Sequence, residues 1–315
     1  MLSFDGCVDW LRRYDDYLII NHRNPDGDAL GSAAALCRGL RQAGKRARVL
    51  PNPNMTERYA RWVEEYGLGD FEPRRIISVD LADEGIIQTN ADGYAGRIDL
   101  AIDHHPSNTH YAAQEYILPE KASCGEIVYM LLRALCGGVD SETATLLYIA
   151  VTTDTGCFRY KNTTPETLRA GAELLEAGAP IDLNRVLFMK KRRSRLELES
   201  MIIGSLDFFM DGEAVIGCIT SDMLERSGAT DDDFDDIASV TGQVQGVETS
   251  VTVRQTGPRT WKISVRTGQY SNADAICAEF GGGGHGMAAG GTIEGTLESA
   301  VEAVRAAVRK HWKEK

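Results

Sequence analysis

The sequence lacks an excess of positive charge, long apolar runs and a secretory signal. Its 34 Lys and Arg residues stand against 46 Asp and Glu residues, which gives a formal net charge of −12 at pH 7. Such a balance argues against long duplex nucleic acid as a partner. No apolar run approaches the roughly 20 residues of a membrane span, and residues 1–17 are polar and acidic. We therefore expect a cytoplasmic protein that binds no membrane.

The sequence also lacks any Cys-x-x-Cys pair. Its seven cysteines are odd in number and scattered along the chain, which predicts reduced, mostly buried thiols. A length of 315 residues suffices for two domains with separate cores. The 43% hydrophobic and 25% charged content is ordinary for a globular protein.

Asp and His side chains gather where regular elements are expected to end. The apolar strand at 17–20 runs into a turn that contains His22, Asp26 and Asp28, and apolar residues at helical spacing follow. An acid at a helix N-terminus is favoured without any ligand. However, an imidazole and two carboxylates within seven residues also form a credible half-site for manganese or a similar ion.

The same pattern recurs at three further element ends, formed by Asp80, by Asp103-His104-His105 and by Asp154. Open α/β sheets bind ligands at the carboxyl ends of their strands. An acid directly after a buried strand has no apolar reason to be there, and bridging two cations supplies one. Adjacent His residues point in different directions, so one can bind metal while the other faces a substrate. Arg159 is either a phosphate-binding guanidinium or an ordinary surface arginine.

Beyond about residue 201, the sequence pattern changes to short β-like runs. The preceding basic run at 190–195 favours a solvated linker helix over nucleic-acid contact, because acids follow it at once. The acidic stretch at 231–236 predicts a solvated loop or helix start. Four glycines at 281–284 precede His285, and they let the backbone approach a ligand and present amides to an anion.

Taken together, these residues resemble a known family. His22-x3-Asp26-x-Asp28, Asp80, Asp103-His104-His105 and Asp154-Thr155-Gly156 look like the four motifs of the DHH phosphoesterase superfamily. Residues 264–267 and 281–291 are similar to the DHH-associated C-terminal domain. The resemblance covers nearly the whole chain. Its layout is similar to that of the two-domain nanoRNase subgroup, described as bifunctional oligoribonucleases and 3′-phosphoadenosine 5′-phosphate phosphatases.

The resemblance implies an α/β fold with two domains. The larger, N-terminal domain would carry a mainly parallel sheet flanked by helices, and the smaller would be an α/β substrate-binding domain. The expected boundaries are 1–186, a linker helix at 187–200, and 201–315, with the active site in a cleft between the domains. A monomer or a homodimer fits equally well.

The resemblance also implies roles for individual residues. Two divalent ions, manganese first and magnesium or cobalt as alternatives, would be held by His22, Asp26, Asp28, Asp80, His104 and Asp154, with Asp80 as the bridge. Catalytic roles fall to Asp103, which would orient a ligand imidazole, and to His105 and Arg159 at the scissile phosphate. Substrate would be bound by Arg266, Thr267, Gly282, Gly283, Gly284 and His285. Thr267 stands where Ser is more familiar and keeps the hydroxyl.

The implied activity is hydrolysis of oligoribonucleotides of about two to five nucleotides to nucleoside monophosphates. Hydrolysis of 3′-phosphoadenosine 5′-phosphate to AMP is a second expected activity. A phosphodiesterase for cyclic di-AMP or linear diadenylate shares every catalytic residue and is the alternative. An inorganic pyrophosphatase is disfavoured by the glycine run, and a long-strand exonuclease by the acidic charge. A nucleotide sensor without catalysis is the rival from another class.

Overall fold

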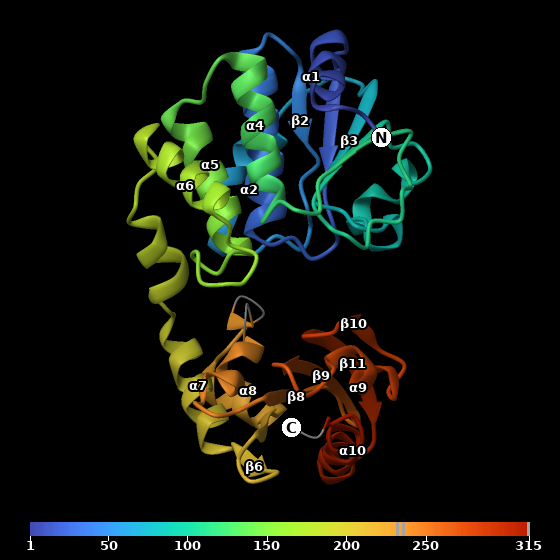
Figure 1. Cartoon of the computed structure of the whole chain (residues 1–315), viewed down its shortest axis with the longest axis vertical. Helices are drawn as coiled ribbons and strands as arrows, with labels where there is room; N and C mark the ends of the chain where they lie inside the picture. The colour runs from blue at the N-terminus through green and yellow to red at the C-terminus, as the bar shows by residue number, and fades with distance from the viewer. Residues whose placement is uncertain (231–232, 235–236, 314–315) are drawn as a thin grey trace. The chain divides into compact units, whose positions relative to one another are not determined.

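The computed structural model describes residues 1–313 except 231–232 and 235–236. It divides the chain into two compact units, Met1–Lys190 and Lys191–Lys315 (Figure 1). The predicted linker at 187–200 is thereby split, since 187–190 fall in the first unit and the following helix in the second. Of the predicted acidic stretch at 231–236, only Asp233 and Phe234 lie within the described residues. Asp233 is buried and bonded to Ser194, not solvated.

The first unit alternates strands and helices, as its apolar runs and caps predict. Its elements are α1 (Phe4–Arg13), β1 (Tyr17–Ile20), α2 (Gly27–Gln42), β2 (Ala47–Val49), α3 (Glu57–Val63), η1 (Glu64–Gly67), β3 (Arg75–Val79), η2 (Glu84–Ile86), η3 (Thr89–Tyr94), β4 (Leu100–Asp103), β5 (Gln114–Ile117), α4 (Cys124–Cys136), α5 (Ser141–Asp154), α6 (Pro165–Glu176) and the π-helical segment η4 (Arg185–Met189). Helix α1 lies in the amino-terminal stretch for which we predicted no element.

The five strands form one parallel sheet in the order β2-β1-β3-β4-β5. One face of the sheet packs against helices, and the other is covered by Leu81, Ile87, Ala91 and their neighbours in the segment after β3 (Figure 1). Strands buried on both faces read as continuous apolar runs. Strand β2 is added on one side of β1, and β3 to β5 follow on the other, so the strand order reverses between β1 and β3. In such sheets ligands bind outside the carboxyl ends of the strands at that point.

Helices α2 and α4 pack against the sheet, α5 packs against both of these helices, and two glycines set how closely the three approach. A Cβ on Gly31 of α2 would lie 2.5 Å from the carbonyl oxygen of Leu146 in α5. A Cβ on Gly125 of α4 would lie 2.6 Å from Cβ of Ala150, also in α5. Both distances are shorter than van der Waals contact, so these positions have room only for hydrogen.

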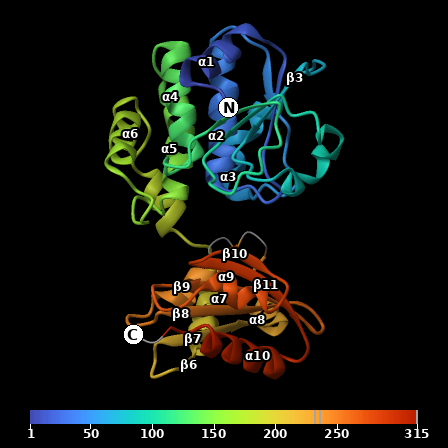
Figure 2. The same cartoon turned by 45° about the vertical axis from the view of Figure 1, so that its right-hand side comes forward.

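The second unit holds a mixed six-stranded sheet in the order β10-β11-β9-β8-β7-β6. Its elements are α7 (Arg193–Gly204), β6 (Asp207–Phe209), β7 (Ala214–Ile219), α8 (Ser221–Ser227), η6 (Ile237–Gln243), β8 (Thr249–Gly257), β9 (Thr260–Thr267), α9 (Ala273–Ala278), β10 (Gly283–His285), β11 (Ala288–Glu294) and α10 (Leu297–Lys310). Helices α9 and α10 share an apolar core with one face of this sheet, and α7 and η6 share one with the other (Figure 2).

The predicted fold class is confirmed: a parallel sheet flanked by helices is followed by a second, smaller α/β unit. None of the described helices is both long and apolar enough to cross a membrane.

Candidate metal centre

The carboxyl ends of three strands and one helix bring the predicted ligands together. His22 follows β1, Asp80 follows β3, and His104 follows β4, while Asp154 is the last residue of α5. Asp26 caps the N-terminus of α2, and Asp28 lies in its first turn. Parallel strands end at one edge of a sheet, so residues far apart in sequence become neighbours there.

Two groups of three side chains each offer ligand atoms within 4.8 Å of one another. One group is His22, Asp26 and Asp80, and the other is Asp28, His104 and Asp154. A third group overlaps both and consists of Asp80, His104 and His105. All six predicted metal ligands therefore lie in one cluster, and each group mixes imidazole with carboxylate as manganese-type ions prefer.

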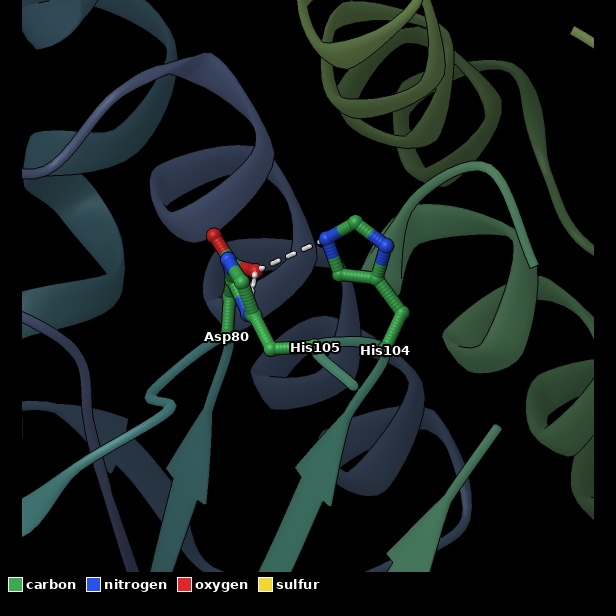
Figure 3. Close-up of side chains that lie close together, drawn as sticks. All are labelled: Asp80, His104 and His105. Atoms are coloured by element: carbon green, nitrogen blue, oxygen red, sulfur yellow. Dashed lines mark ion pairs between the residues drawn. The ribbon is translucent and has the colours of Figure 1, made fainter. Parts of the chain in front are cut away.

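Asp80 belongs to the first group, and its two carboxylate oxygens face histidines of different groups. Its Oδ1 is 3.5 Å from Nε2 of His104 and 3.6 Å from Nδ1 of His105 (Figure 3). Its Oδ2 is 3.8 Å from Nε2 of His22. Asp80 is only 3% exposed, and its Oδ1 has no hydrogen-bond partner among the described residues. A buried carboxylate oxygen without a donor is costly, and a cation would satisfy it.

Asp28 is held rigidly by donors from two helices. Its Oδ2 accepts the backbone N–H of Cys124 at 2.7 Å, and its Oδ1 accepts the N–H of Gly125 at 2.9 Å and the hydroxyl of Ser32 at 3.0 Å. The two amides belong to the first turn of α4, whose dipole favours a negative charge. Asp26 caps α2 by accepting the N–H groups of Asp28 and Ala29, so the capping interpretation of this turn also holds.

The protein alone leaves this cluster with too much negative charge. Burial, reinforced by Asp80 and Asp154, raises the pKa of Asp28 well above its usual range. Burial also raises the pKa of Asp154 to about 7. For His104 burial acts in the opposite sense, but the carboxylates around it raise its pKa to about 11. Acids forced together in this way take up protons unless cations replace them, so this donor set fits divalent ions.

Hydrogen-bond acceptors at Nδ1 orient the imidazoles of His104 and His105. Nδ1 of His104 lies 3.2 Å from the carbonyl oxygen of Lys121, and Nδ1 of His105 lies 2.8 Å from Oδ1 of Asp103. In the neutral imidazole that binds a metal, an acceptor at Nδ1 fixes the proton on that nitrogen and leaves the lone pair on Nε2. In His104 that nitrogen faces Asp28, Asp80 and Asp154. Asp103 thus bonds the imidazole of His105, and the prediction that it orients the imidazole of a metal ligand stays a prediction.

Sequence reasoning missed a buried amide network beneath His22. Asn52 donates to the carbonyl of His22 at 2.9 Å and to Oδ1 of Asn21 at 2.8 Å. Gln88 accepts the N–H of Asn21 at 3.1 Å and donates to Asn90 at 2.8 Å. These amides join segments up to 67 residues apart. No local spacing in the sequence marks such a contact.

Replacing Gln88 with leucine should destabilise the fold. The change keeps the volume but leaves the buried N–H of Asn21 without its acceptor, so we expect the free energy of unfolding to fall by roughly 1–3 kcal/mol. Urea denaturation measures the change. Gln114→Leu, at an exposed position that starts β5, is the control and should shift stability by less than about 0.5 kcal/mol. Equal stability of the two variants would contradict the assigned role.

Arg159 lies beyond an unusual turn that follows Asp154. Gly156, Cys157 and Phe158 have φ values of +53°, +59° and +62°, which form a single left-handed turn that L-residues adopt only at a cost. Arg159 is exposed, and its Nε donates to the carbonyl of Gly156 at 2.6 Å. Its contact with a phosphate stays a prediction.

The predicted substrate-binding residues of the second unit lie at one end of its sheet. Arg266 and His285 both pair with Ala288 of β11, so the three occupy one row across adjacent strands. Arg266 is exposed. Thr267 is buried and donates its hydroxyl to the carbonyl of Gly286 at 2.9 Å. Binding of substrate by this row also stays a prediction.

The glycine run forms the edge strand β10 and the turn before it. The N–H of Gly282 donates to the carbonyl of Cys277 at 3.0 Å, and the N–H of Gly284 donates to Oδ1 of Asp274 at 2.8 Å. These two amides therefore already have acceptors within the protein. A Cβ at Gly282 would lie 2.1 Å from the carbonyl oxygen of Gly290, so close strand packing requires glycine there.

Comparison with known proteins places both units in described families. Residues 16–151 match the model of the DHH family N-terminal domain, and residues 215–313 match that of the DHHA1 domain. The chain is 32% identical over 291 residues to the bifunctional oligoribonuclease and PAP phosphatase NrnA of Thermus thermophilus, a match that covers 88% of this chain and 84% of the relative. It is 25% identical to the protein of the same name from Bacillus subtilis, over 89% and 90% of the two chains.

Among solved structures, an exopolyphosphatase-related protein from Bacteroides fragilis superposes with a TM-score of 0.84. The two are 26% identical, and the match covers 98% of this chain and 95% of the other.

Proposed function

The chain belongs to the DHH family of metal-dependent phosphoesterases, and from that premise we propose that it hydrolyses short oligoribonucleotides to nucleoside monophosphates. Hydrolysis of 3′-phosphoadenosine 5′-phosphate to AMP at the same site is part of the proposal. The observation that carries it is the position of Asp80, which belongs to one ligand group with His22 and turns its other carboxylate oxygen toward His104 of the second group.

The residues of the cluster have separable roles in this proposal. Asp80 bridges the two ligand groups, and the amides of α4 keep Asp28 in place. Two divalent ions, when bound, would supply a nucleophile at neutral pH and neutralise the charge that develops on the phosphoryl group. We assign manganese first, because of the mixed imidazole and carboxylate donors. His105 presents Nε2, and we propose that it contacts the scissile phosphate or protonates the leaving oxygen.

Short substrates are favoured by the charge of the chain and by its relatives. A net charge of −12 disfavours binding of a long nucleic-acid strand. The relatives from Thermus thermophilus and Bacillus subtilis, which match along most of their length, are named as oligoribonucleases and PAP phosphatases. In our proposal Arg266 and His285 bind the phosphate and nucleotide at the end of the substrate.

We also infer a cytoplasmic location, because all seven cysteines are unpaired and disulfides are rare in reducing compartments.

A substrate panel tests the proposal directly. Purified protein with manganese would be offered linear diadenylate, a longer RNA, cyclic di-AMP, 3′-phosphoadenosine 5′-phosphate and pyrophosphate in parallel, with products followed by chromatography. We expect fast conversion of linear diadenylate to AMP and slow action on the longer RNA and the cyclic dinucleotide. Preference for cyclic di-AMP would favour the alternative phosphodiesterase, and binding without turnover of any substrate would favour a sensor.

Divalent ions should stabilise the folded chain measurably. Ions that bind only the folded state add about 2.7 kcal/mol at a hundred times their dissociation constant, and here they also relieve the repulsion among buried acids. We expect manganese to raise Tm by several degrees and a chelator to reverse the shift. Potassium chloride at equal ionic strength is the control. An unchanged Tm with manganese would count against a metal centre.

A further inference from the structure

One buried residue behind the cluster has no assigned role in the chemistry described so far. Asn108 lies in the loop after β4, is 7% exposed, and belongs to none of the three ligand groups. No sequence pattern drew attention to it.

The side-chain amide of Asn108 is fully engaged. Its Nδ2 donates to Oδ2 of Asp103 at 2.7 Å and to the carbonyl of Leu81 at 3.2 Å. Its Oδ1 accepts the N–H of His110 at 2.8 Å. A flipped amide would point its oxygen at two acceptors and its nitrogen at a donor, so the orientation is set by its partners.

The first donor completes the shell around Asp103. That carboxylate is fully buried, and its Oδ1 accepts both the N–H of His104 and Nδ1–H of His105 at 2.8 Å. With Asn108 on Oδ2, three donors surround the carboxylate. Both oxygens of Asp103 are thereby held in place, so Nδ1 of His105 meets a fixed acceptor. Nε2 of His105 is then the nitrogen left for the substrate.

The second donor reaches the turn that carries Asp80. Leu81 directly follows Asp80, whose φ of +55° lies in the left-handed region. The carbonyl of Leu81 also accepts the hydroxyl of Tyr111 at 2.7 Å. Asn108 alone, among the described donors to this carbonyl, also contacts Asp103. A single amide thus joins the turn that holds the bridging carboxylate to the acid that orients His105.

We propose that Asn108 is a positioning residue that fixes the tautomer and orientation of His105 relative to Asp80. This inference rests on the proposed function, because the position matters only if His105 acts on a phosphate placed at the Asp80 cluster. Residues that orient a ligand or catalytic imidazole typically change activity 10- to 100-fold when removed.

The test compares Asn108→Ala and the isosteric Asn108→Asp with Tyr111→Phe. The tyrosine variant removes the other donor to Leu81 and leaves Asp103 untouched. We expect both Asn108 variants to lose about 10- to 100-fold in kcat on linear diadenylate, with KM changed by less than about threefold and bound metal retained. Tyr111→Phe should keep kcat within about twofold of the wild-type value, whether or not the variant is less stable.

A spectroscopic measurement separates positioning from folding and from the choice of substrate. In the magnesium-loaded, ¹⁵N-histidine-labelled protein, the His105 resonances should report a proton on Nδ1, and they should change in both Asn108 variants but not in Tyr111→Phe. Wild-type resonances in the Asn108 variants, with kcat like that of Tyr111→Phe, would overturn the inference. If wild-type protein cleaves no dinucleotide while the resonances still change, the positioning role stands and the proposed substrate fails.

Discussion

Asp80→Asn is expected to abolish metal binding and nearly all turnover. The substitution keeps the shape of the side chain but removes the charge that faces both ligand groups, one oxygen toward His22 and the other toward His104. Metal ions supply several kcal/mol of transition-state stabilisation, and each 1.36 kcal/mol is tenfold in rate, so kcat should fall by at least about a thousandfold. Metal content by mass spectrometry and turnover of linear diadenylate are the two measurements.

A matched control lies three residues further along the chain. Asp83 is also an acid after β3, but its carboxylate caps η2 by accepting the N–H of Gly85. Asp83→Asn should therefore retain both ions and full turnover. An Asp80→Asn protein that holds two ions and remains active would refute the bridging role.

His105→Gln is expected to separate chemistry from metal binding. Nδ1 of His105 is engaged by Asp103, which leaves Nε2 to contact the phosphate or protonate the leaving oxygen. Proton transfer by a positioned side chain contributes about 10²- to 10⁴-fold, so kcat should fall in that range. His105 belongs to neither of the two groups that together hold the six proposed ligands. Metal content should therefore stay near that of wild type.

His110→Gln is the control for this prediction. That histidine lies five residues further on, pairs with Glu115, and has a side chain that is 60% exposed. Its replacement should leave kcat within about twofold. Loss of metal from His105→Gln would assign this histidine to the ligands instead, and an unchanged kcat would exclude it from catalysis.

Local sequence patterns predicted those helices and strands that are marked by apolar runs, helical spacing or capping residues. Strand β1 (Tyr17–Ile20) is an unbroken apolar run because both faces of the sheet are buried there, and the helix α2 that follows shows apolar residues at helical spacing. Helix α1 was missed, although Ser3 caps it and its buried residues Cys7, Val8 and Leu11 recur at helical spacing. Strand β6 has three residues and exists through its pairing with β7. Its sequence alone carries no such signal.

The six proposed metal ligands could be found from sequence because strand ends are local features that the topology then gathers. The residues that hold these ligands in place could not be found in this way. The amides that hold Asp28 come from residues 96 and 97 positions away, and the Gln88 network and Asn108 likewise depend on contacts made only in the folded chain. Backbone N–H groups have no residue type, and buried Asn and Gln have no periodicity, so neither leaves a pattern to recognise.

The close approach of α2, α4 and α5 constrains any redesign of this protein. A methyl group at Gly31 would meet backbone atoms of α5, and one at Gly125 would meet Ala150 of the same helix. Helix α5 ends in Asp154, α2 carries Asp28, and α4 supplies the amides that Asp28 accepts. The missing side chains of these two glycines therefore set the distances between the proposed ligands. Substitutions that fill this helix contact to gain thermal stability are expected to shift Asp28 relative to Asp154 and to lower activity, although no proposed ligand is changed.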